Sequence, residues 1–347
     1  MQAMKKENPM TFKERFFLGE IPFEDIDRYT SRWNFSDETC TLAAYLGLNG
    51  EEEDVWISQS DEALEALLEK EKAAYLACPT KILFTDLDGT LLNNNKEISP
   101  ANREAIRLAR EAGHIIVLTT GRPMASILPL AQDLQLDGPG SYIIGFNGSV
   151  VYDCGEQRFL MNRTISLDDV LSVFDAAEKA GIHCQSYEEN HVLYLRDDEE
   201  GRSYFEHTHT PCQIIAGTDE LSKEPNKLLL IDLHNHQKLE DFRAAVEPKF
   251  QGRIQFVFSS NTYLEVIPAG TSKGNALHFL CNYLNIPVAN TVAAGDSEND
   301  LSMIREAAIG AAMANSMVPV KEAADYVTMA DNDHDGFAEI IKNCLLK

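Results

Sequence analysis

Three aspartates stand where a metal ion and a phosphate group could both be bound. Asp86 and Asp88 follow the apolar run at 81–85, and Asp296 follows a second apolar run at 291–294. Residues two apart at the end of an extended strand point to the same side of the chain. Clustered carboxylates repel one another unless a cation lies between them, and hard oxygen ligands of this kind suit Mg²⁺. Since Mg²⁺ in such sites also takes phosphate oxygens, we expect a Mg²⁺ site that receives a phosphorylated ligand.

Other residues could bind the phosphate itself. Lys273, at the start of a helix predicted over 271–284, offers a point charge. The Thr120 hydroxyl and the main-chain N–H groups of Thr120 and Gly121 can bind phosphate oxygens, because glycine lets the backbone approach closely. One aspartate carboxylate is then free to attack phosphorus, and another, two residues away, could act as general acid and base.

Each feature alone also has an ordinary structural explanation. An Asp-Gly-Thr after a strand can be only a turn, a single lysine is usually solvated, and the acids of 296–300 could cap a helix. The joint pattern favours chemistry, because these groups and Asn147 all lie at predicted strand ends or helix starts. Ligands of open α/β sheets bind beyond the carboxyl ends of the strands, so we expect these side chains to converge at one edge.

The elements that must position these residues begin at residue 81. Short apolar runs alternate with amphipathic segments, which predicts an α/β fold with a doubly wound parallel sheet. The expected strands lie at 81–85, 114–119, 142–146, 291–294, 308–313 and 326–328. The expected helices lie at 100–112, 123–135 and 271–284. The core would then comprise residues 79–164 and 263–347, with the parallel pattern resuming at 264–267.

Residues 165–262 have a less regular pattern and are expected to form a separate α+β domain. Helices are predicted at 168–180 and 237–248, with strands at 192–195, 228–233 and 254–258. The interval from Asp88 to Thr120 is too short to hold an inserted domain, whereas the interval from Thr120 to Lys273 leaves room for one. We therefore expect this domain to interrupt the core after its third strand.

Residues 1–78 form a third region, with 17 acidic and 8 basic residues. Two helices are expected, one at 36–48 and one that begins near 58–61 and ends near residue 76. Pro79 then marks the boundary with the core. We expect a mainly helical extension whose role is open between packing on the core, oligomerisation and binding of a partner, with packing favoured over regulation.

The composition limits the partners of the chain, whose formal net charge is −25. Such a polyanion would repel nucleic acid and anionic membranes, since both are bound by clustered Lys and Arg. Seven cysteines are spread without a C-x-x-C spacing, which argues against a disulfide framework or a zinc ribbon and favours a reducing compartment. No apolar run approaches the ~18 residues of a membrane span, and no signal-peptide core follows the basic N-terminus, so we expect a cytoplasmic protein.

Four segments together resemble the motifs of the haloacid dehalogenase-like (HAD) hydrolase superfamily, in particular its Cof-type phosphatases of subclass IIB. In chain order they read FTDLDGTLL at 84–92, TTGR at 119–122, TSKG at 271–274 and GDSEND at 295–300. The resemblance covers roughly residues 80–347. It implies a Rossmann-like HAD core and an inserted cap domain of the C2B type that closes over the site. The N-terminal extension has no counterpart in the usual family member.

The resemblance also implies a role for each motif residue. Asp86 would be the nucleophile that forms an aspartyl phosphate, and Asp88 would be the general acid and base. To donate a proton near neutral pH, Asp88 needs a raised pKa in the closed complex. Mg²⁺ would be held by the Asp86 side chain, the Asp88 carbonyl oxygen and Asp296. The phosphate would be bound by Leu87 N–H, Thr120, Gly121, Lys273 and Asn299. Asp300 and Arg122 would lie behind these residues, with Asp300 orienting the metal site or Lys273.

The implied activity is that of a phosphatase acting on a small phosphorylated metabolite, with a sugar phosphate favoured over pyridoxal phosphate and flavin mononucleotide. The cap residues Gln185, Tyr187, Glu188 and Tyr194 are candidates for contact with the leaving group. Two alternatives stay open: a phosphosugar mutase, which would need a bisphosphate activator, and an inert ligand-binding scaffold, which would be free to lose any of the motifs. A homo-oligomer, or a partner bound through the N-terminal extension, is also open.

Overall fold

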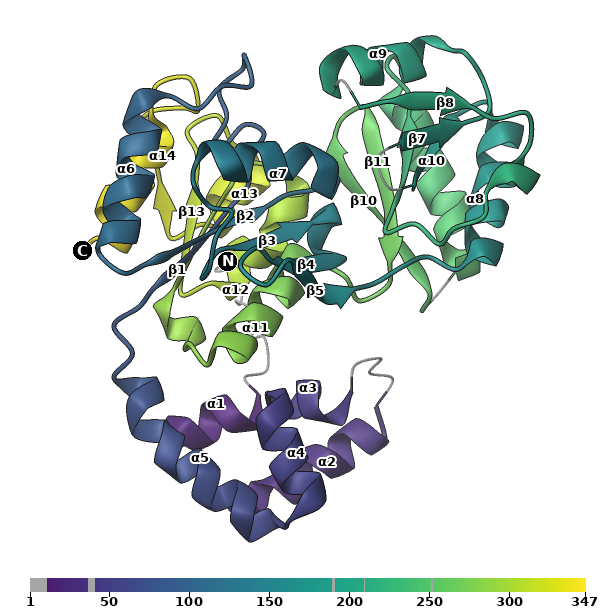
Figure 1. Cartoon of the computed structure of the whole chain (residues 1–347). Coiled ribbons are helices and arrows are strands. Elements are labelled where there is room, and N and C mark those ends of the chain that lie inside the picture. Colours follow the sequence, from purple (N-terminus) through teal and green to yellow (C-terminus); the bar gives the residue numbers. More distant parts are fainter. Residues whose placement is uncertain (1–10, 37–40, 189–190, 209, 251) are drawn as a thin grey trace.

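The computed structural model describes residues 11–36, 41–188, 191–208, 210–250 and 252–347. The chain forms three parts, which are an α/β core, a cap domain with a sheet of its own beside the core, and a helical N-terminal module of residues 11–78 (Figure 1). The module lies on the side of the core where helix α11 (Lys273–Leu284) is found.

The core sheet has eight strands within the described residues. In spatial order they are β14 (Tyr326–Val327), β13 (Ile309–Ala312), β12 (Thr291–Gly295), β1 (Ile82–Thr85), β2 (Ile115–Thr119), β3 (Tyr142–Gly145), β4 (Val150–Asp153) and β5 (Arg158–Asn162). The strands from β14 to β3 pair in parallel, which confirms the doubly wound sheet. The antiparallel hairpin of β4 and β5 extends the sheet at one edge, which the sequence pattern does not indicate.

Helices cover both faces of the core sheet, because its central strands are apolar on both sides. On β1, Leu83 belongs to the buried cluster on one face and Phe84 to the cluster on the other. The first cluster includes α6 (Pro100–Glu111), α7 (Met124–Asp133) and α14 (Gly336–Ile340), and the second includes α11, α12 (Leu301–Glu306) and α13 (Val318–Ala323). Since β1 lies near the middle of the sheet, Asp86 directly after it lies near the middle of the sheet edge.

The cap contains a six-stranded sheet within the described residues. Its spatial order is β10 (Ile254–Ser260), β11 (Tyr263–Pro268), β9 (Leu228–Ile231), β6 (His183–Glu188), β7 (His191–Tyr194) and β8 (Cys212–Ile214). Helices α8 (Leu167–Ala180) and α10 (His236–Val246) pack on one face, and α9 (Glu199–Thr208) packs on the other. The chain enters the cap after β5 and leaves it after β11, so the cap interrupts the core after its hairpin.

The prediction that the parallel core pattern resumes at 264–267 is wrong. These residues belong to β11, which pairs antiparallel with β9 and β10 in the cap sheet. Leu264 lies opposite Leu230 and Val266 lies opposite Leu228, so the strand packs with other apolar cap strands. A short apolar run does not reveal which of two sheets it joins. The core boundary that we expected at residue 263 therefore moves past the end of β11.

The N-terminal module is helical, as expected, and comprises α1 (Phe12–Phe17), α2 (Ile26–Asn34), α3 (Leu42–Leu46), α4 (Gly50–Ser58) and α5 (Asp61–Leu76). Helix α5 confirms the second predicted helix. The first, expected over 36–48, is too long, since α3 begins only after Thr41. Thr41 has an extended backbone, and its hydroxyl accepts a hydrogen bond from Ala44 N–H, which makes it the N-cap. The part of this prediction at 37–40 lies outside the described residues.

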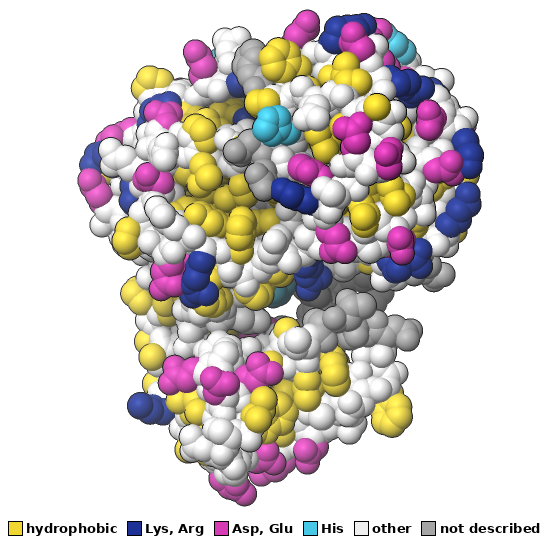
Figure 2. Space-filling model, turned by 45° about the vertical axis from the view of Figure 1, so that its right-hand side comes forward, with side chains coloured by type: hydrophobic (Ala, Val, Ile, Leu, Met, Phe, Trp, Pro, Cys, Tyr) yellow, Lys and Arg dark blue, Asp and Glu magenta, His cyan; other side chains and the backbone are white. Residues whose placement is uncertain are grey.

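Aromatic side chains fill the interior of the N-terminal module. Phe12, Phe17 and Tyr75 are among them, and the Phe17 and Tyr75 rings lie 4.6 Å apart in an edge-on arrangement. On the surface of the N-terminal module, at the bottom of Figure 2, acidic side chains predominate over basic ones on the face that is shown. Among the described residues, no helix combines the length and the apolar character needed to cross a membrane.

A buried ion pair lies beneath the surface that joins the N-terminal module to the core. Lys13 Nζ is 2.5 Å from Glu52 Oε1, and both side chains are almost fully buried. Glu71 of α5 lies beside this pair and accepts a hydrogen bond of 3.4 Å from Asn285, the residue that ends α11. Burial, followed by the hydrogen bond to Glu52 and its charge, raises the pKa of Glu71 to about 7, although Lys13 acts in the opposite direction.

We predict that Glu71→Gln stabilises the N-terminal module above pH 7. Because the folded-state pKa of Glu71 lies above its ordinary value of 4.5, the stability linked to this group is fully present below about pH 4.5 and is lost as pH rises through about 7. The substitution should remove this dependence and raise the free energy of unfolding at pH 8 by about 1 kcal/mol, since Glu71 is partly exposed and solvent screens the effect.

Both tryptophans of the chain, Trp33 and Trp56, lie in this module, so their fluorescence reports its unfolding. Denaturant unfolding followed by tryptophan emission at pH 5 and pH 8 checks the prediction. Glu69→Gln, at an exposed position of the same helix, is the matched control and should change neither value by more than a few tenths of a kcal/mol. An equal pH dependence in wild type and Glu71→Gln would contradict the prediction.

Candidate active site

Lys273 connects two carboxylates at the carboxyl edge of the core sheet. Its Nζ lies 2.6 Å from Asp86 Oδ1 and 2.6 Å from Asp300 Oδ1. Asp86 follows the central strand β1, and Lys273 is the first residue of α11, whose N-cap Ser272 accepts a hydrogen bond from Asn275 N–H. Lys273 and Asp300 are fully buried and Asp86 is 6% exposed, so this ion pair is well shielded from solvent.

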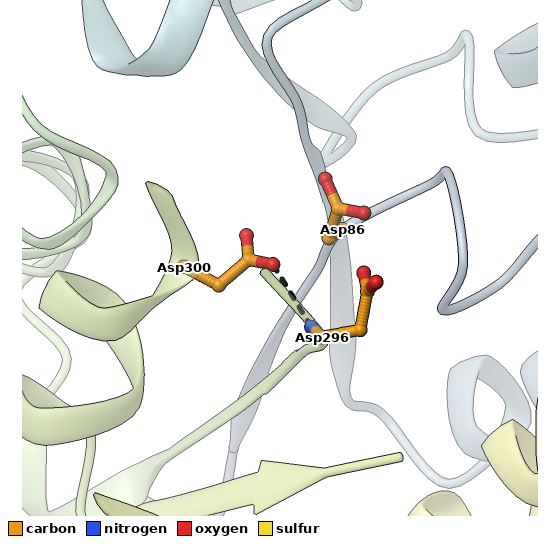
Figure 3. A group of neighbouring side chains, drawn as sticks. All are labelled: Asp86, Asp296 and Asp300. Atoms are coloured by element: carbon orange, nitrogen blue, oxygen red, sulfur yellow. Dashed lines mark hydrogen bonds between the residues drawn. The ribbon is translucent and has the colours of Figure 1, made fainter. Parts of the chain in front are cut away.

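Asp296 completes the acidic group and is held in place by the loop that follows it. Asp300 Oδ2 accepts a hydrogen bond from the main-chain N–H of Asp296 at 2.9 Å (Figure 3). It accepts a second one from the main-chain N–H of Ser297 at 3.0 Å. The Asp296 carboxylate accepts from the Thr90 hydroxyl at 3.1 Å and from the Ser297 hydroxyl at 3.0 Å. Figure 3 shows the carboxylates of Asp86, Asp296 and Asp300 gathered around a common region.

The three carboxylates fit a hard divalent cation. One oxygen of each of Asp86, Asp296 and Asp300 can be chosen so that the three atoms lie within 4.8 Å of one another. Burial raises the pKa of Asp86 well above its usual range, and Lys273 only partly offsets this because Asp300 and Asp296 act in the same direction as burial. Burial and the charge of Asp300 raise the pKa of Asp296 to about 7. When ionised, the three carboxylates carry more negative charge than Lys273 neutralises, and carboxylate oxygens are the ligands that Mg²⁺ prefers.

Asp88 points to a different set of partners. Arg122 donates two hydrogen bonds of 2.6 Å to the Asp88 carboxylate, from Nε to Oδ2 and from a terminal nitrogen to Oδ1. Lys96 Nζ lies 2.7 Å from Asp88 Oδ1. Burial opposes the charged form, but Arg122 and Lys96 together lower the pKa of Asp88 to about 2. The raised pKa that we expect for Asp88 in the closed complex therefore stays a prediction, and it requires that Asp88 first separate from these two cations.

The loop after β2 lies beside these carboxylates. Thr120 is buried, and its hydroxyl accepts a hydrogen bond from Arg122 N–H at 3.2 Å. Asn147, after β3, has a left-handed backbone with φ of 57° and bonds to Asn299 at 2.9 Å through its side chain. Gly121 lies against Asn147, since a Cβ atom at this position would be 3.0 Å from Asn147 Oδ1.

The structure thus brings most of the predicted site residues to one sheet edge. Thr120, Gly121, Arg122 and Asn299 line the same cavity as Asp86 and Asp88, and Lys273 reaches that group through Asp86. The Leu87 side chain is fully buried in the core cluster, so its main chain is the part that can reach the site.

Two cap residues also reach the loop after β2, and sequence reasoning missed both. Lys227 Nζ donates to the Gly121 carbonyl oxygen at 2.6 Å and lies 2.9 Å from Glu265 Oε2. Glu265 accepts a further hydrogen bond from Asn147 Nδ2 at 2.8 Å. Both charged residues are only 4% exposed. In the sequence, each of the two is a single charged residue next to an apolar strand segment. Because charged residues are rarely buried unless they are paired, this pattern could have revealed them.

A cavity of about 440 Å³ opens above the carboxylates, between the core and the cap. Its cap side is formed by Tyr204, His207, Thr208, Thr210, Lys227, Leu229, Ser259, Ser260, Tyr263 and Glu265. The four residues that we named as candidates for contact with the leaving group are not among the described residues that line this cavity. Gln185 and Tyr187 are buried behind Tyr204, because their strand β6 is covered there by α9.

Comparisons with known proteins agree with this geometry. The family model described as haloacid dehalogenase-like hydrolase matches residues 83–341. A Bacillus subtilis phosphatase named for 5-amino-6-(5-phospho-D-ribitylamino)uracil is 31% identical, over 77% of this chain and 96% of its own. A haloacid dehalogenase-like hydrolase from Bacteroides thetaiotaomicron has a similar solved structure, with a TM-score of 0.69 and 30% identity over 76% of this chain and 98% of that one. A sugar phosphatase of HAD subclass IIB aligns with a TM-score of 0.65 and 27% identity, over 76% and 98% of the two chains.

The chain therefore belongs to the haloacid dehalogenase-like hydrolase family. Within that family it belongs to the phosphatases of subclass IIB. Because the matched region starts at residue 83, the N-terminal module lies outside the part that the family model describes.

We predict that Lys227→Met weakens both the fold and the site. The change leaves the Glu265 carboxylate buried without its cation, which should lower the free energy of unfolding by about 3 kcal/mol. It also removes the donor to the Gly121 carbonyl oxygen, so kcat/KM for a phosphate ester should fall about tenfold. The double variant Lys227→Met with Glu265→Gln has no unpaired charge, so most of the stability should return.

The double variant separates the effect on stability from the effect on kcat/KM, and so serves as the control. Chemical denaturation and steady-state kinetics on both variants should show stability restored in the double variant while kcat/KM stays low. Recovery of kcat/KM in step with stability would mean that Lys227 serves the fold alone and does not position the loop at Gly121.

Proposed function

We propose that this chain is a Mg²⁺-dependent phosphatase that hydrolyses a small phosphorylated metabolite, with a sugar phosphate favoured, through an aspartyl phosphate on Asp86. The observation that carries the proposal is the position of Asp86. It lies at the floor of a cavity of about 440 Å³, next to Lys273, the buried carboxylate of Asp300 and the half-buried carboxylate of Asp296. A carboxylate in that position is suited to attack a phosphate that enters the cavity.

Asp86 and Asp296 would hold the Mg²⁺, together with the main chain at Asp88, and Asp300 would keep Asp296 and Lys273 in place. A bound cation supplies the positive charge that this group lacks and favours the ionised form of Asp86. Lys273, Thr120 and the main chain at Gly121 then bind the phosphate oxygens and offset the charge that develops on them.

The proposed reaction has two steps. In the first, an Asp86 oxygen bonds to phosphorus while the bond from phosphorus to the ester oxygen breaks, and protonated Asp88 gives its proton to the departing alkoxide. In the second, a water oxygen bonds to phosphorus while the bond from phosphorus to the Asp86 oxygen breaks. The water passes a proton to Asp88, and inorganic phosphate departs. The ionised Asp88 of this structure suits the second step. For the first step, Asp88 must separate from Arg122 and Lys96, and we propose that these cations turn toward the incoming phosphate.

The lining of the cavity favours a leaving group with many hydroxyl groups. Besides Thr120 and Ser297 beside the carboxylates, its hydroxyl-bearing residues are Ser126, Thr208, Thr210, Ser259, Ser260, Tyr204 and Tyr263. Hydroxyl side chains both donate and accept hydrogen bonds, which matches the hydroxyl groups of a sugar. The sugar phosphatase among the structural neighbours adds support to this choice.

We predict that phosphate release from a panel of phosphorylated metabolites requires Mg²⁺ and stops with EDTA. Asp86→Asn should lower turnover by a factor on the order of 10³ or more, because the amide is a poor nucleophile. It should also abolish covalent labelling by a ³²P-labelled substrate after an acid quench. Asp133→Asn, at an exposed aspartate paired with Arg103, is the matched control and should behave as wild type. Wild-type turnover by Asp86→Asn, or phosphate release that persists in EDTA, would contradict the proposed mechanism.

A further inference from the structure

A row of buried polar side chains runs through the cap behind the cavity. His183, Gln185 and Tyr187 alternate along β6, so they share the face of the sheet that α9 covers. Their exposed fractions are 4%, 0% and 7%. Buried polar groups lower stability unless each is hydrogen-bonded, and three in succession on one strand suggest that their order serves a purpose.

These side chains form one continuous chain of hydrogen bonds that ends at the cavity. His183 Nδ1 lies 2.8 and 2.9 Å from the two carboxylate oxygens of Asp198, and Nε2 lies 3.1 Å from Gln185 Oε1. Gln185 Nε2 donates to the Tyr187 hydroxyl at 3.0 Å, and that hydroxyl donates to the Tyr204 hydroxyl at 3.0 Å. Tyr204 lines the cavity, so the chain links Asp198 on the outer side of the cap to the substrate space.

The chemistry of the donors and acceptors gives this chain a direction. The direction is set at Gln185, whose carbonyl oxygen lies against His183 Nε2 and whose amide N–H groups therefore face Tyr187. The Gln185 N–H donates a hydrogen bond to the Tyr187 hydroxyl. The Tyr187 O–H in turn donates a hydrogen bond to the Tyr204 oxygen. A hydroxyl oxygen that accepts one hydrogen bond keeps its own proton for another partner. Tyr204 is therefore left as a donor at the wall of the cavity.

Helix α9 is fixed so that this donor stays in place. Asp198 Oδ1 also accepts a hydrogen bond of 3.0 Å from the main-chain N–H of Gly201, in the first turn of α9. Gly201 packs directly on Tyr194, since a Cβ atom there would be 2.9 Å from the Tyr194 ring. Tyr204 follows Gly201 by three residues, about one helical turn, so both ends of the chain of hydrogen bonds are tied to the same helix.

We propose that Tyr204 determines specificity by donating a hydrogen bond to an oxygen acceptor of the leaving group, and that His183, Gln185 and Tyr187 keep it a donor. This inference rests on the proposed phosphatase function, because it assumes that the leaving group occupies the cap side of the cavity. The ligand class is a phosphate ester whose leaving group carries oxygen acceptors, as a sugar or pyridoxal phosphate does. Tyr204 acts on the substrate directly, and the other three residues are positioning residues.

The first test is Tyr204→Phe, measured as a ratio of two kcat/KM values. One substrate is the fastest of ribose 5-phosphate, glucose 6-phosphate and pyridoxal phosphate, and the other is phenyl phosphate, whose leaving group has no acceptor beyond the ester oxygen. Loss of the donor should lower the ratio of the first value to the second about tenfold, the effect expected for one neutral hydrogen bond. A general weakening of the cap would lower both values together and leave the ratio unchanged.

The second test reverses the chain without touching the cavity. In Gln185→Glu the new carboxylate has no N–H, so Tyr187 must donate to it and then accept from Tyr204. The Tyr204 proton turns inward, and the ratio should fall about as far as in Tyr204→Phe. Tyr194→Phe removes a hydroxyl from the same cap interior but lies outside the chain, so it is the matched control and should leave the ratio within twofold of wild type. If Gln185→Glu does not fold, Tyr187→Phe takes its place, because it removes the hydroxyl that donates to Tyr204 and should also lower the ratio.

The outcomes separate this inference from the proposed function. If wild type hydrolyses both substrates and the ratio in Tyr204→Phe stays within twofold, the role of Tyr204 is wrong and the phosphatase proposal stands. If Tyr204→Phe lowers the ratio and folded Gln185→Glu does not, the chain of hydrogen bonds does not orient Tyr204. If wild type hydrolyses neither substrate in the presence of Mg²⁺, the proposed function fails and this inference fails with it.

Discussion

The structure around the site depends on the buried ammonium group of Lys273, which lies between Asp86 and Asp300. Moving charges out of water costs several kcal/mol per ion, so a buried ion pair is weak evidence of stabilisation by itself. Burial would lower the pKa of Lys273, but Asp300 and Asp86 more than offset this and raise it, so the lysine stays charged. One lysine does not balance three carboxylates. The arrangement is therefore better understood as a site that receives further positive charge than as a source of stability.

Glycines at two positions let the main chain come close to these charges. Gly89 has φ of 81°, and a Cβ atom there would lie 2.6 Å from Asp296 Oδ2, so the turn after β1 can close on Asp296 only without a side chain. Gly121 is similarly enclosed, with Glu265 Oε1 at 3.0 Å from an added Cβ atom. The loops after β1 and β2 thus approach the acidic groups with their main chains, which leaves main-chain N–H groups near the position where a phosphate would lie.

The sequence predicts the core and its motif residues well, because strand ends of a parallel sheet meet at one edge and the motif residues are spaced to reach it. It does not predict what depends on contacts between distant segments. The run at 264–267 is apolar enough for either sheet, and its place in the cap follows from pairing with β9. Lys227 and Glu265 have meaning only through Gly121 and Asn147, which lie more than a hundred residues away in sequence. Likewise, Arg122 and Lys96 set the charge state of Asp88 in a way that no local pattern encodes.

These long-range contacts divide the cap into two parts with different tasks. Lys227 and Glu265 hydrogen-bond to core groups at Gly121 and Asn147, so this part of the cap contacts the loops that we propose to bind the phosphate. Helix α9 contacts the cavity from the opposite face of the cap sheet to α8 and α10, and its Tyr204 is oriented from within the cap. Substitutions on α9 can therefore change which leaving group is accepted while the contacts around the phosphate stay intact. A single core can serve different phosphate esters in this way, because recognition of the phosphate and recognition of the leaving group rest on separate sets of contacts.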